Sequence, residues 1–214
     1  MLKITIRDFV PPILPKLFKA NFNAGRKGQE CLFDGSDSKF KEIVSNSRTY
    51  AEYGCGASTI WVARECSCRL LSVDGSVEWV EFVESSCGDS SRVAVRHVDL
   101  GPLGKWGKPK SYKKVRNFGE YRNWIWNQGS VPDVVLVDGR FRVACFLTSL
   151  LKAKEGTVII FDDYVDRENY HVVEKFISPQ FYCGRQAFFR VSDINDKKRL
   201  EIGDLIDKFE YVMD

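Results

Sequence analysis

Acidic side chains stand at the ends of several apolar stretches, where carboxylates could bind a ligand or act as a base. The stretches are "RLLSVDG", "RVAVRHVD", "DVVLVDG" and "TVIIFDDY". Their closing acids are Asp74, Asp99, Asp138, Asp162 and Asp163. In a sheet of parallel strands the carboxyl ends gather at one edge, and ligands bind there. One such acid is commonly a helix N-cap, but acids at successive strand ends predict a binding edge.

The segment "YAEYGCGAST" contains a glycine-rich loop that opens a predicted helix. A dinucleotide-binding loop of the form G-x-G-x-x-G has a third glycine, and here that position is Thr59. Glu52 precedes Gly54 and Gly56, and its carboxylate would repel a pyrophosphate but attract a cationic amino group. Asp74, at the end of the next strand, can accept hydrogen bonds from ribose hydroxyls.

Helical and strand patterns alternate over residues 37–192, which predicts an α/β fold. Residues 134–137 and 158–161 are apolar throughout, which is typical of parallel strands covered on both faces. We therefore predict a doubly wound, Rossmann-like sheet, mostly parallel, with "QFYCG" and "AFFRVS" as an antiparallel hairpin at its C-terminal edge. Residues 1–35, rich in proline, are predicted to be a lead-in segment before one domain at 36–214.

Composition favours a soluble protein of the cytoplasm. The chain has 214 residues, and its seven cysteines form an odd set without a disulfide framework. The start of the sequence does not have the pattern of a secretory signal. A net charge of +3 is too small to favour nucleic acid as a partner. The most basic stretch, residues 105–122, is either a solvated loop or a flap suited to an acidic substrate.

"EYGCGAST" followed by "LLSVDGS" resembles the cofactor-binding half of the class I S-adenosylmethionine-dependent methyltransferases, whose first motif is E/D-x-G-x-G. The resemblance implies S-adenosylmethionine as cofactor, with its methionine part on the glycine loop, its ribose at Asp74 and its adenine near Asp99. The residues predicted to bind it are Glu52, Gly54, Gly56, Ser58, Asp74, Gly75, Asp99 and Asp138.

An Asp after the fourth strand and an Asp pair after the fifth resemble the metal-dependent O-methyltransferases of the catechol and macrolide-sugar types. The resemblance implies Mg²⁺ or another divalent cation on Asp138, Asp162 and Asp163, which would lower the pKa of an acceptor hydroxyl. Without a metal, a side chain must take the proton, and His171 is one candidate. Arg140 and Arg142 suit an anionic group of the substrate. The predicted catalytic residues are Asp138, Asp163, His171 and Arg140.

"VDLGPLGKWGKP", "VLVDGRFRVACFL" and the opening "RDFVPPILPKL" are similar to phrases of bacterial methyltransferases, some associated with surface-polysaccharide biosynthesis. This resemblance implies O-methylation of a sugar hydroxyl, for instance on an acidic sugar such as Kdo, close to a membrane surface. Acceptors are then small molecules or glycans, and the oligomeric state stays open. Nucleic-acid bases are disfavoured because "VDGRF" stands where an N-P-P-Y motif would be. An NAD-dependent oxidoreductase and a non-catalytic nucleotide-binding protein remain as alternatives.

Overall fold

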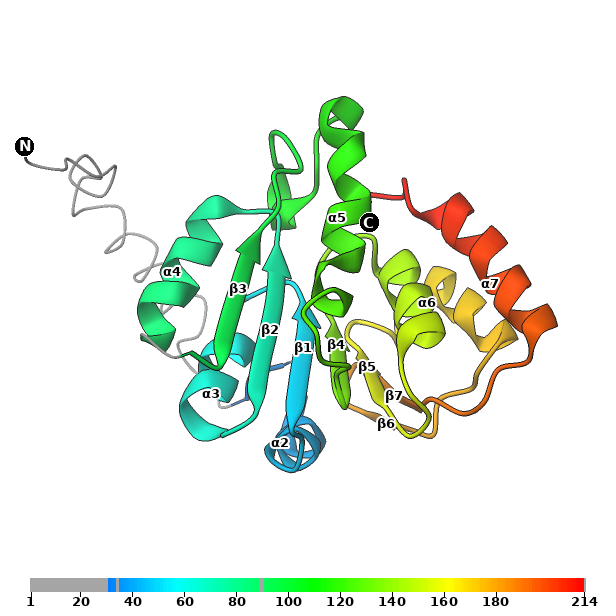
Figure 1. Cartoon of the computed structure of the whole chain (residues 1–214), viewed down its shortest axis with the longest axis horizontal. Coiled ribbons are helices and arrows are strands. Elements are labelled where there is room, and N and C mark those ends of the chain that lie inside the picture. The colour runs from blue at the N-terminus through cyan, green and yellow to red at the C-terminus, as the bar shows by residue number, and fades with distance from the viewer. Residues whose placement is uncertain (1–30, 34, 89–90, 214) are drawn as a thin grey trace, which may run out of the picture. The chain divides into compact units, whose positions relative to one another are not determined.

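A computed structural model describes residues 31–33, 35–88 and 91–213 of the protein. These residues form an α/β fold around a sheet with the strand order β3-β2-β1-β4-β5-β7-β6 (Figure 1). The predicted lead-in, residues 1–35, lies almost wholly outside the described residues. The boundary between it and the domain at 36–214 therefore stays a prediction.

The sheet confirms the predicted doubly wound, mostly parallel arrangement. Its parallel strands are β1 (Thr49–Tyr53), β2 (Arg69–Asp74), β3 (Val93–His97), β4 (Val134–Val137) and β5 (Val158–Phe161). The C-terminal hairpin consists of β6 (Phe181–Cys183) and β7 (Gln186–Arg190), and β7 pairs antiparallel with both β5 and β6. Every residue of β4 and β5 is buried, as their unbroken apolar runs predict.

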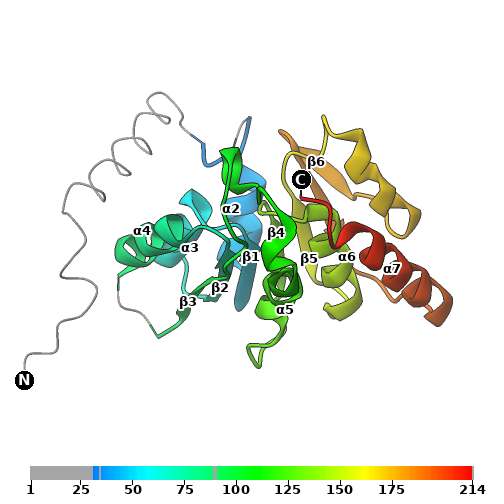
Figure 2. The same cartoon turned by 90° about the horizontal axis from the view of Figure 1, so that it is seen from above.

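Helices cover both faces of the sheet (Figure 2). In the described residues they are α2 (Ser38–Ser45), α3 (Ala57–Glu65), α4 (Val77–Cys87), α5 (Phe118–Asn123), α6 (Arg142–Lys152) and α7 (Asp196–Phe209). Side chains of α2 and α3 pack into one apolar layer, and those of α5, α6 and α7 pack into a larger one across the sheet. No helix in this part of the chain is long and apolar enough to cross a lipid bilayer.

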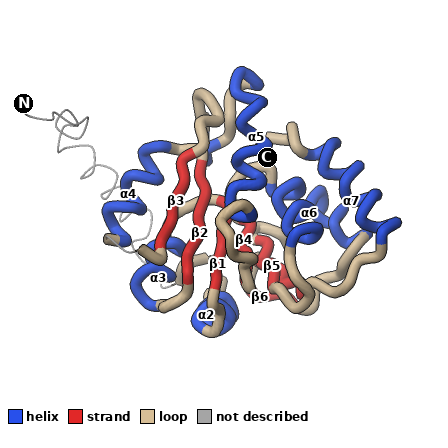
Figure 3. The backbone as a smooth tube through the Cα atoms, in the orientation of Figure 1, coloured by secondary structure: helices blue, strands red, loops and turns tan. Residues whose placement is uncertain are grey.

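Two segments differ from the expected pattern. The predicted helix after β5 is a 3₁₀ helix, Glu168–Lys175, which contains the β-branched pair Val172–Val173. The polar closing segment is the helix α7, which is capped by the side chain of Asn195 and buries Ile202 and Ile206 against the domain. The long connection from β3 to β4 consists of loop, short 3₁₀ turns and α5 (Figure 3).

Candidate active site at the carboxyl edge of the sheet

Strand register aligns the predicted site residues at one edge of the sheet. Tyr53 of β1 pairs with Val73 of β2 and with Val137 of β4, and Val137 pairs with Phe161 of β5. The residues that follow these four are Gly54, Asp74, Asp138 and Asp162. They therefore occupy neighbouring positions at the carboxyl edge, as the sequence predicts.

The glycine loop after β1 packs directly on the loop after β4. Gly54 has a φ of +89°, and its N–H donates to the carbonyl of Val73 at 2.8 Å. A Cβ on Gly54 would lie 2.8 Å from the Cα of Gly139 and 2.9 Å from the carbonyl oxygen of Asp138. A Cβ on Gly139 would in turn meet the hydroxyl of Tyr121 and the backbone of Gly54. Only a pair of glycines lets these two loops approach so closely.

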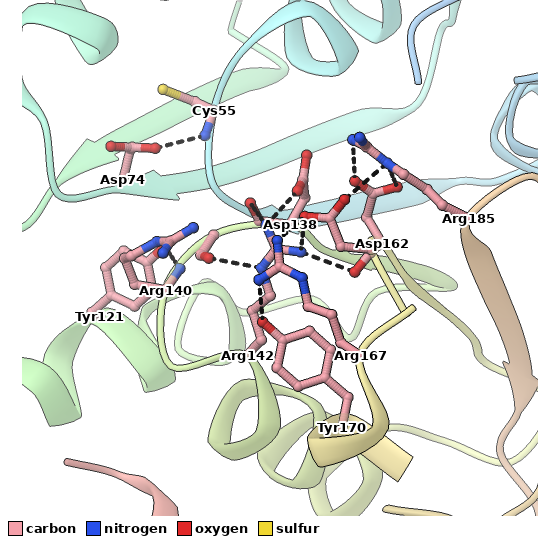
Figure 4. A network of polar contacts seen from close by, with 12 residues as sticks. Cys55, Asp74, Tyr121, Asp138, Arg140, Arg142, Asp162, Arg167, Tyr170 and Arg185 are labelled. Atoms are coloured by element: carbon pink, nitrogen blue, oxygen red, sulfur yellow. Dashed lines mark hydrogen bonds and ion pairs between the residues drawn. The ribbon is translucent and has the colours of Figure 1, made fainter. Parts of the chain in front are cut away.

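Asp74 ties the glycine loop to the end of β2. Its Oδ2 accepts a hydrogen bond from the N–H of Cys55 at 3.0 Å (Figure 4), and its Oδ1 accepts one from the N–H of Ser76 at 2.7 Å. Burial raises the pKa of Asp74, although these amides and the positive charge of Arg140 favour the ionised form. The carboxylate is therefore held at the mouth of the loop, where a ribose is expected.

Gly75 and Asp99 border the region expected to take the adenine. A Cβ on Gly75 would clash with the side chain of Leu100, and the Gly75 carbonyl lies 3.2 Å from Nε2 of His97. The side chain of Asp99 is turned outward to Lys114, whose Nζ lies 2.7 Å from its Oδ2. That lysine lowers the pKa of Asp99. Contact of Gly75 or Asp99 with a cofactor stays a prediction.

Glu52 is surrounded by hydroxyl groups in the interior of the domain. Its side chain is fully buried, and it accepts hydrogen bonds from the hydroxyls of Tyr50 at 2.7 Å, of Ser58 at 2.8 Å and of Thr59. Thr59 also accepts the N–H of Gly56 at 2.8 Å. The carboxylate and Ser58 therefore fix the start of α3 under the glycine loop. The sequence could not show this, because hydroxyls beside an acid can point either way. Contact of Glu52 or Ser58 with a cofactor stays a prediction.

Burial raises the pKa of Glu52 to about 7, although its hydroxyl partners favour the charged form. Because the folded pKa lies above the ordinary value of 4.5, this group's stabilising contribution is complete below pH 4.5 and is lost as the pH rises through 7. Glutamine does not ionise, so the variant should not lose this contribution as the pH rises. We therefore expect the unfolding free energy of Glu52→Gln, taken relative to that of wild type, to increase by about 2 kcal/mol from pH 5 to pH 8. Urea unfolding at both pH values measures this change.

The matched control is Glu81→Gln, which alters an exposed glutamate of α4. The difference in unfolding free energy between Glu81→Gln and wild type should stay constant with pH. Parallel profiles for Glu52→Gln and wild type would show that Glu52 is ionised throughout this range.

Three aspartates at the carboxyl edge of the sheet form ion pairs with three arginines (Figure 4). Arg142, 4% exposed, lies 2.9 Å from Oδ1 of Asp138 and 3.1 Å from Oδ2 of Asp163. Arg185, in the β6–β7 turn, lies 2.6 Å from Asp162 and 3.0 Å from Asp163. Arg167 lies 2.9 Å from Oδ2 of Asp163. We call these six residues the Asp–Arg cluster.

Oδ2 of Asp138 has no hydrogen-bond partner among the residues that the structure describes, whereas both oxygens of Asp162 and Asp163 have arginine partners. The Asp138 side chain is 30% exposed. Burial, together with the negative charges of Asp162 and Asp163, raises the pKa of Asp138 well above its usual range, against the pull of Arg142. Asp138 is therefore the carboxylate of the Asp–Arg cluster best able to receive a proton.

A divalent cation fits this cluster poorly. One oxygen from each of Asp138, Asp162 and Asp163 lies within 4.8 Å of the others, close enough to share an ion. Their three negative charges are, however, already balanced by Arg142, Arg167 and Arg185, and a cation would have to displace guanidinium groups. The metal assignment stays a prediction, and these ion pairs weigh against it.

His171 and Arg140 differ in how close they lie to the edge. The ring of His171 stacks on Tyr164 with centroids 4.7 Å apart, and its Nε2 lies 3.1 Å from the Tyr164 carbonyl. No contact brings it to Asp138 or Asp163 within the described part of the chain. Arg140 follows the Gly139 turn, and its N–H donates to the hydroxyl of Tyr121 at 3.1 Å. A catalytic role for either residue stays a prediction.

Sequence reasoning missed Gly139, Tyr121, Arg167 and Arg185. One local pattern could have indicated Gly139, because the same three residues, "VDG", stand at the ends of both β2 and β4. No local pattern indicates Arg185, because only the pairing of β7 with β5 brings the β6–β7 turn to Asp162.

No protein-family model and no curated protein matches the chain. Among solved structures it is similar to a methyltransferase-like protein from Silicibacter pomeroyi, with 29% identity and a TM-score of 0.68 over 78% of this chain and 91% of the other. It is also similar in fold to a methyltransferase from Geobacter sulfurreducens, with 13% identity and a TM-score of 0.51 over 86% of this chain and 93% of the other.

Proposed function

We propose that this chain, a class I methyltransferase, binds S-adenosylmethionine on its glycine loop and transfers the methyl group to a hydroxyl oxygen held beside Asp138. One observation carries the proposal: Gly54 packs on Asp138 and Gly139 while Asp74 binds the amide of Cys55. The cofactor loop, the acid expected to bind ribose and the candidate base therefore form one unit.

Methyl transfer is an in-line displacement that depends on positioning and on removal of the acceptor's proton. In the proposed reaction the hydroxyl proton passes to Oδ2 of Asp138. The new O–CH₃ bond forms as the S–CH₃ bond breaks, and S-adenosylhomocysteine leaves. A raised pKa suits Asp138 to this task, because a base works best when its pKa approaches the working pH. Arg142 holds the other carboxylate oxygen and orients the group.

The acceptor that we propose is a sugar hydroxyl of a surface polysaccharide or its precursor, modified in the cytoplasm. Arg140 follows the Asp138–Gly139 turn, and the lysine-rich loop after β3 leaves the same edge of the sheet. Both would attract an acidic sugar such as Kdo. The likeness to methyltransferases disfavours the alternative of an NAD-dependent oxidoreductase.

Asp138→Asn tests the assigned base. We expect the affinity for S-adenosylhomocysteine, measured by calorimetry, to change less than about threefold, and methyl transfer to fall about a hundredfold or more. Transfer is measured with a labelled methyl group on a panel of nucleotide-activated and lipid-linked sugars. We expect EDTA to leave the wild-type rate unchanged, since the Asp–Arg cluster is charge-balanced without a cation.

Asp166→Asn is the matched control, because Asp166 is an exposed carboxylate on the loop that follows Asp163. It should keep both binding and transfer. Full transfer by Asp138→Asn would refute Asp138 as the base, and loss of activity with EDTA would restore the metal assignment. Binding of NADH without S-adenosylhomocysteine would refute the methyltransferase reaction itself.

A further inference from the structure

The loop that joins β3 to α5 carries two of the most exposed aromatic side chains of the described residues. Trp106 is 79% exposed and Tyr112 is 55% exposed. In Figure 1 the arrowheads of β2 and β3 point toward this loop, which extends beyond the carboxyl edge of the sheet. Large apolar surfaces left in water are unfavourable and often mark an interaction site.

The backbone holds Trp106 outward. The N–H of Gly104 donates to the carbonyl of Lys108 at 2.7 Å, the N–H of Lys110 donates to that of Pro102 at 2.9 Å, and Leu103 forms a β-bridge with Pro109. Within this closed turn Trp106 has a φ of +60°, a left-handed conformation that is unfavourable for a bulky residue. The turn therefore presents the indole at its tip instead of folding it onto the domain.

The charged residues of this loop are all basic. Residues 101–119 contain five lysines, one arginine and no acid. The basic residues are Lys105, Lys108, Lys110, Lys113, Lys114 and Arg116, and all are exposed. In the part of the chain that the structure describes, Lys114 alone among them has a carboxylate partner, Asp99 at 2.7 Å. The surface therefore has an unbalanced positive charge.

The C-terminal end of the chain enlarges this surface. The hydroxyl of Tyr112 donates to the carbonyl of Tyr211 at 3.2 Å. Tyr211 is 46% exposed and the adjacent Val212 is 40% exposed. Together, the six basic residues with Trp106, Tyr112, Tyr211 and Val212 form what we call the basic–aromatic patch.

We propose that the basic–aromatic patch binds the surface of an anionic lipid bilayer. Tryptophan and tyrosine favour the headgroup region, where their rings are partly buried and their polar atoms stay hydrated. Lysines beside them are attracted by anionic headgroups, and each adds to the affinity at low ionic strength. The chain would then rest on the membrane as a peripheral protein, with the carboxyl edge of its sheet toward the lipid.

The shape of the patch favours a bilayer over an acidic glycan. Trp106 stands on a protruding tip, and a Cβ on the adjacent Gly107 would meet no atom within 4 Å. Nζ of the neighbouring Lys105 lies 5.4 Å from the centroid of the Trp106 ring. Among the described residues no second aromatic ring lies against Trp106, so the two could not enclose a sugar between them. A convex aromatic tip fits insertion into an interface. The lysines of this patch belong to the loop that we also propose attracts an acidic acceptor, so the vesicle test is made without an acceptor and separates the two roles.

Co-sedimentation with vesicles tests the inference on the full chain. We expect binding to phosphatidylcholine vesicles that contain phosphatidylglycerol, little binding to phosphatidylcholine alone, and weaker binding as salt rises. Trp106→Ala should weaken binding about tenfold. Replacing Lys105, Lys108 and Lys110 together by glutamine should weaken it roughly a hundredfold at low salt.

Two matched controls remove similar groups from elsewhere. Leu200→Ala removes an apolar side chain that is 73% exposed on α7, and glutamine at Lys175, Lys197 and Lys208 removes three exposed charges. Both should bind vesicles as wild type does, and all variants should keep the wild-type melting temperature. The inference is overturned if anionic vesicles are not bound, if controls and patch variants lose binding equally, or if the chain binds polygalacturonate and not vesicles.

Discussion

Gly54→Ala is expected to lower the free energy of unfolding by about 3 kcal/mol and to prevent cofactor binding. The added methyl would sit 2.8 Å from the Cα of Gly139 and 2.9 Å from the carbonyl oxygen of Asp138, and backbone atoms cannot rotate out of the way. The φ of +89° adds strain for any residue with a Cβ. Urea unfolding and calorimetry with S-adenosylhomocysteine measure the two effects.

Gly56→Ala is the control within the same loop. A Cβ there would meet no atom within 4 Å, and the φ of 175° is extended backbone that any residue adopts. We expect a loss of about 1 kcal/mol or less, since alanine is a poorer N-cap than glycine. Weakened cofactor binding by this stable variant would support placing the cofactor against Gly56. An equally small loss for Gly54→Ala would refute the tight packing of the two loops.

Arg142→Leu is expected to lower the free energy of unfolding by about 4 kcal/mol at neutral pH, because it leaves Asp138 and Asp163 without their buried partner. The pKa of Asp138, already raised by burial, should rise further in the variant. A folded pKa above the unfolded value means that stability present at acid pH is lost as the pH rises. The deficit should therefore be smallest near pH 4 and should grow toward neutrality, as urea unfolding at several pH values would show.

Arg167→Leu provides the comparison, because Arg167 also contacts Asp163 but its side chain is 45% exposed. Solvent screens such a pair, so we expect a loss below about 1 kcal/mol with little pH dependence. Equal losses for the two variants would show that the Asp–Arg cluster behaves as a surface network. A deficit for Arg142→Leu that does not vary with pH would show that Asp138 stays charged without its partner.

The sequence predicted those features of the fold that depend on local pattern. Unbroken apolar runs such as Val134–Val137 and Val158–Phe161 require burial on both faces, and the structure places them at the centre of the sheet. The C-terminal hairpin was also predictable, because two short strand-like segments flank a glycine-containing turn. Parallel neighbours then bring the strand-end acids together without further information.

The sequence did not predict which side chains contact one another at the site. Ser58 and Thr59 turn their hydroxyls toward Glu52 from the first turn of α3, which the sequence did not indicate. That arrangement depends on rotamers and on helix–sheet packing, which the spacing of residues along the chain does not fix. The same holds for Arg185, which is distant in sequence from Asp138 and reaches the Asp–Arg cluster only through the β5–β7 pairing.

β7 lies between β5 and β6 in the sheet although it follows both of them in the chain. The ribosome delivers Asp138, Asp162 and Asp163 before Arg185 leaves the exit tunnel. Without the hairpin the sheet would end in β5, and Asp162 and Asp163 would not have Arg185 as a partner. Addition of the last strands therefore both covers the open side of β5 and neutralises that charge. The last segment of the chain thus completes both the sheet and the charge balance of the Asp–Arg cluster.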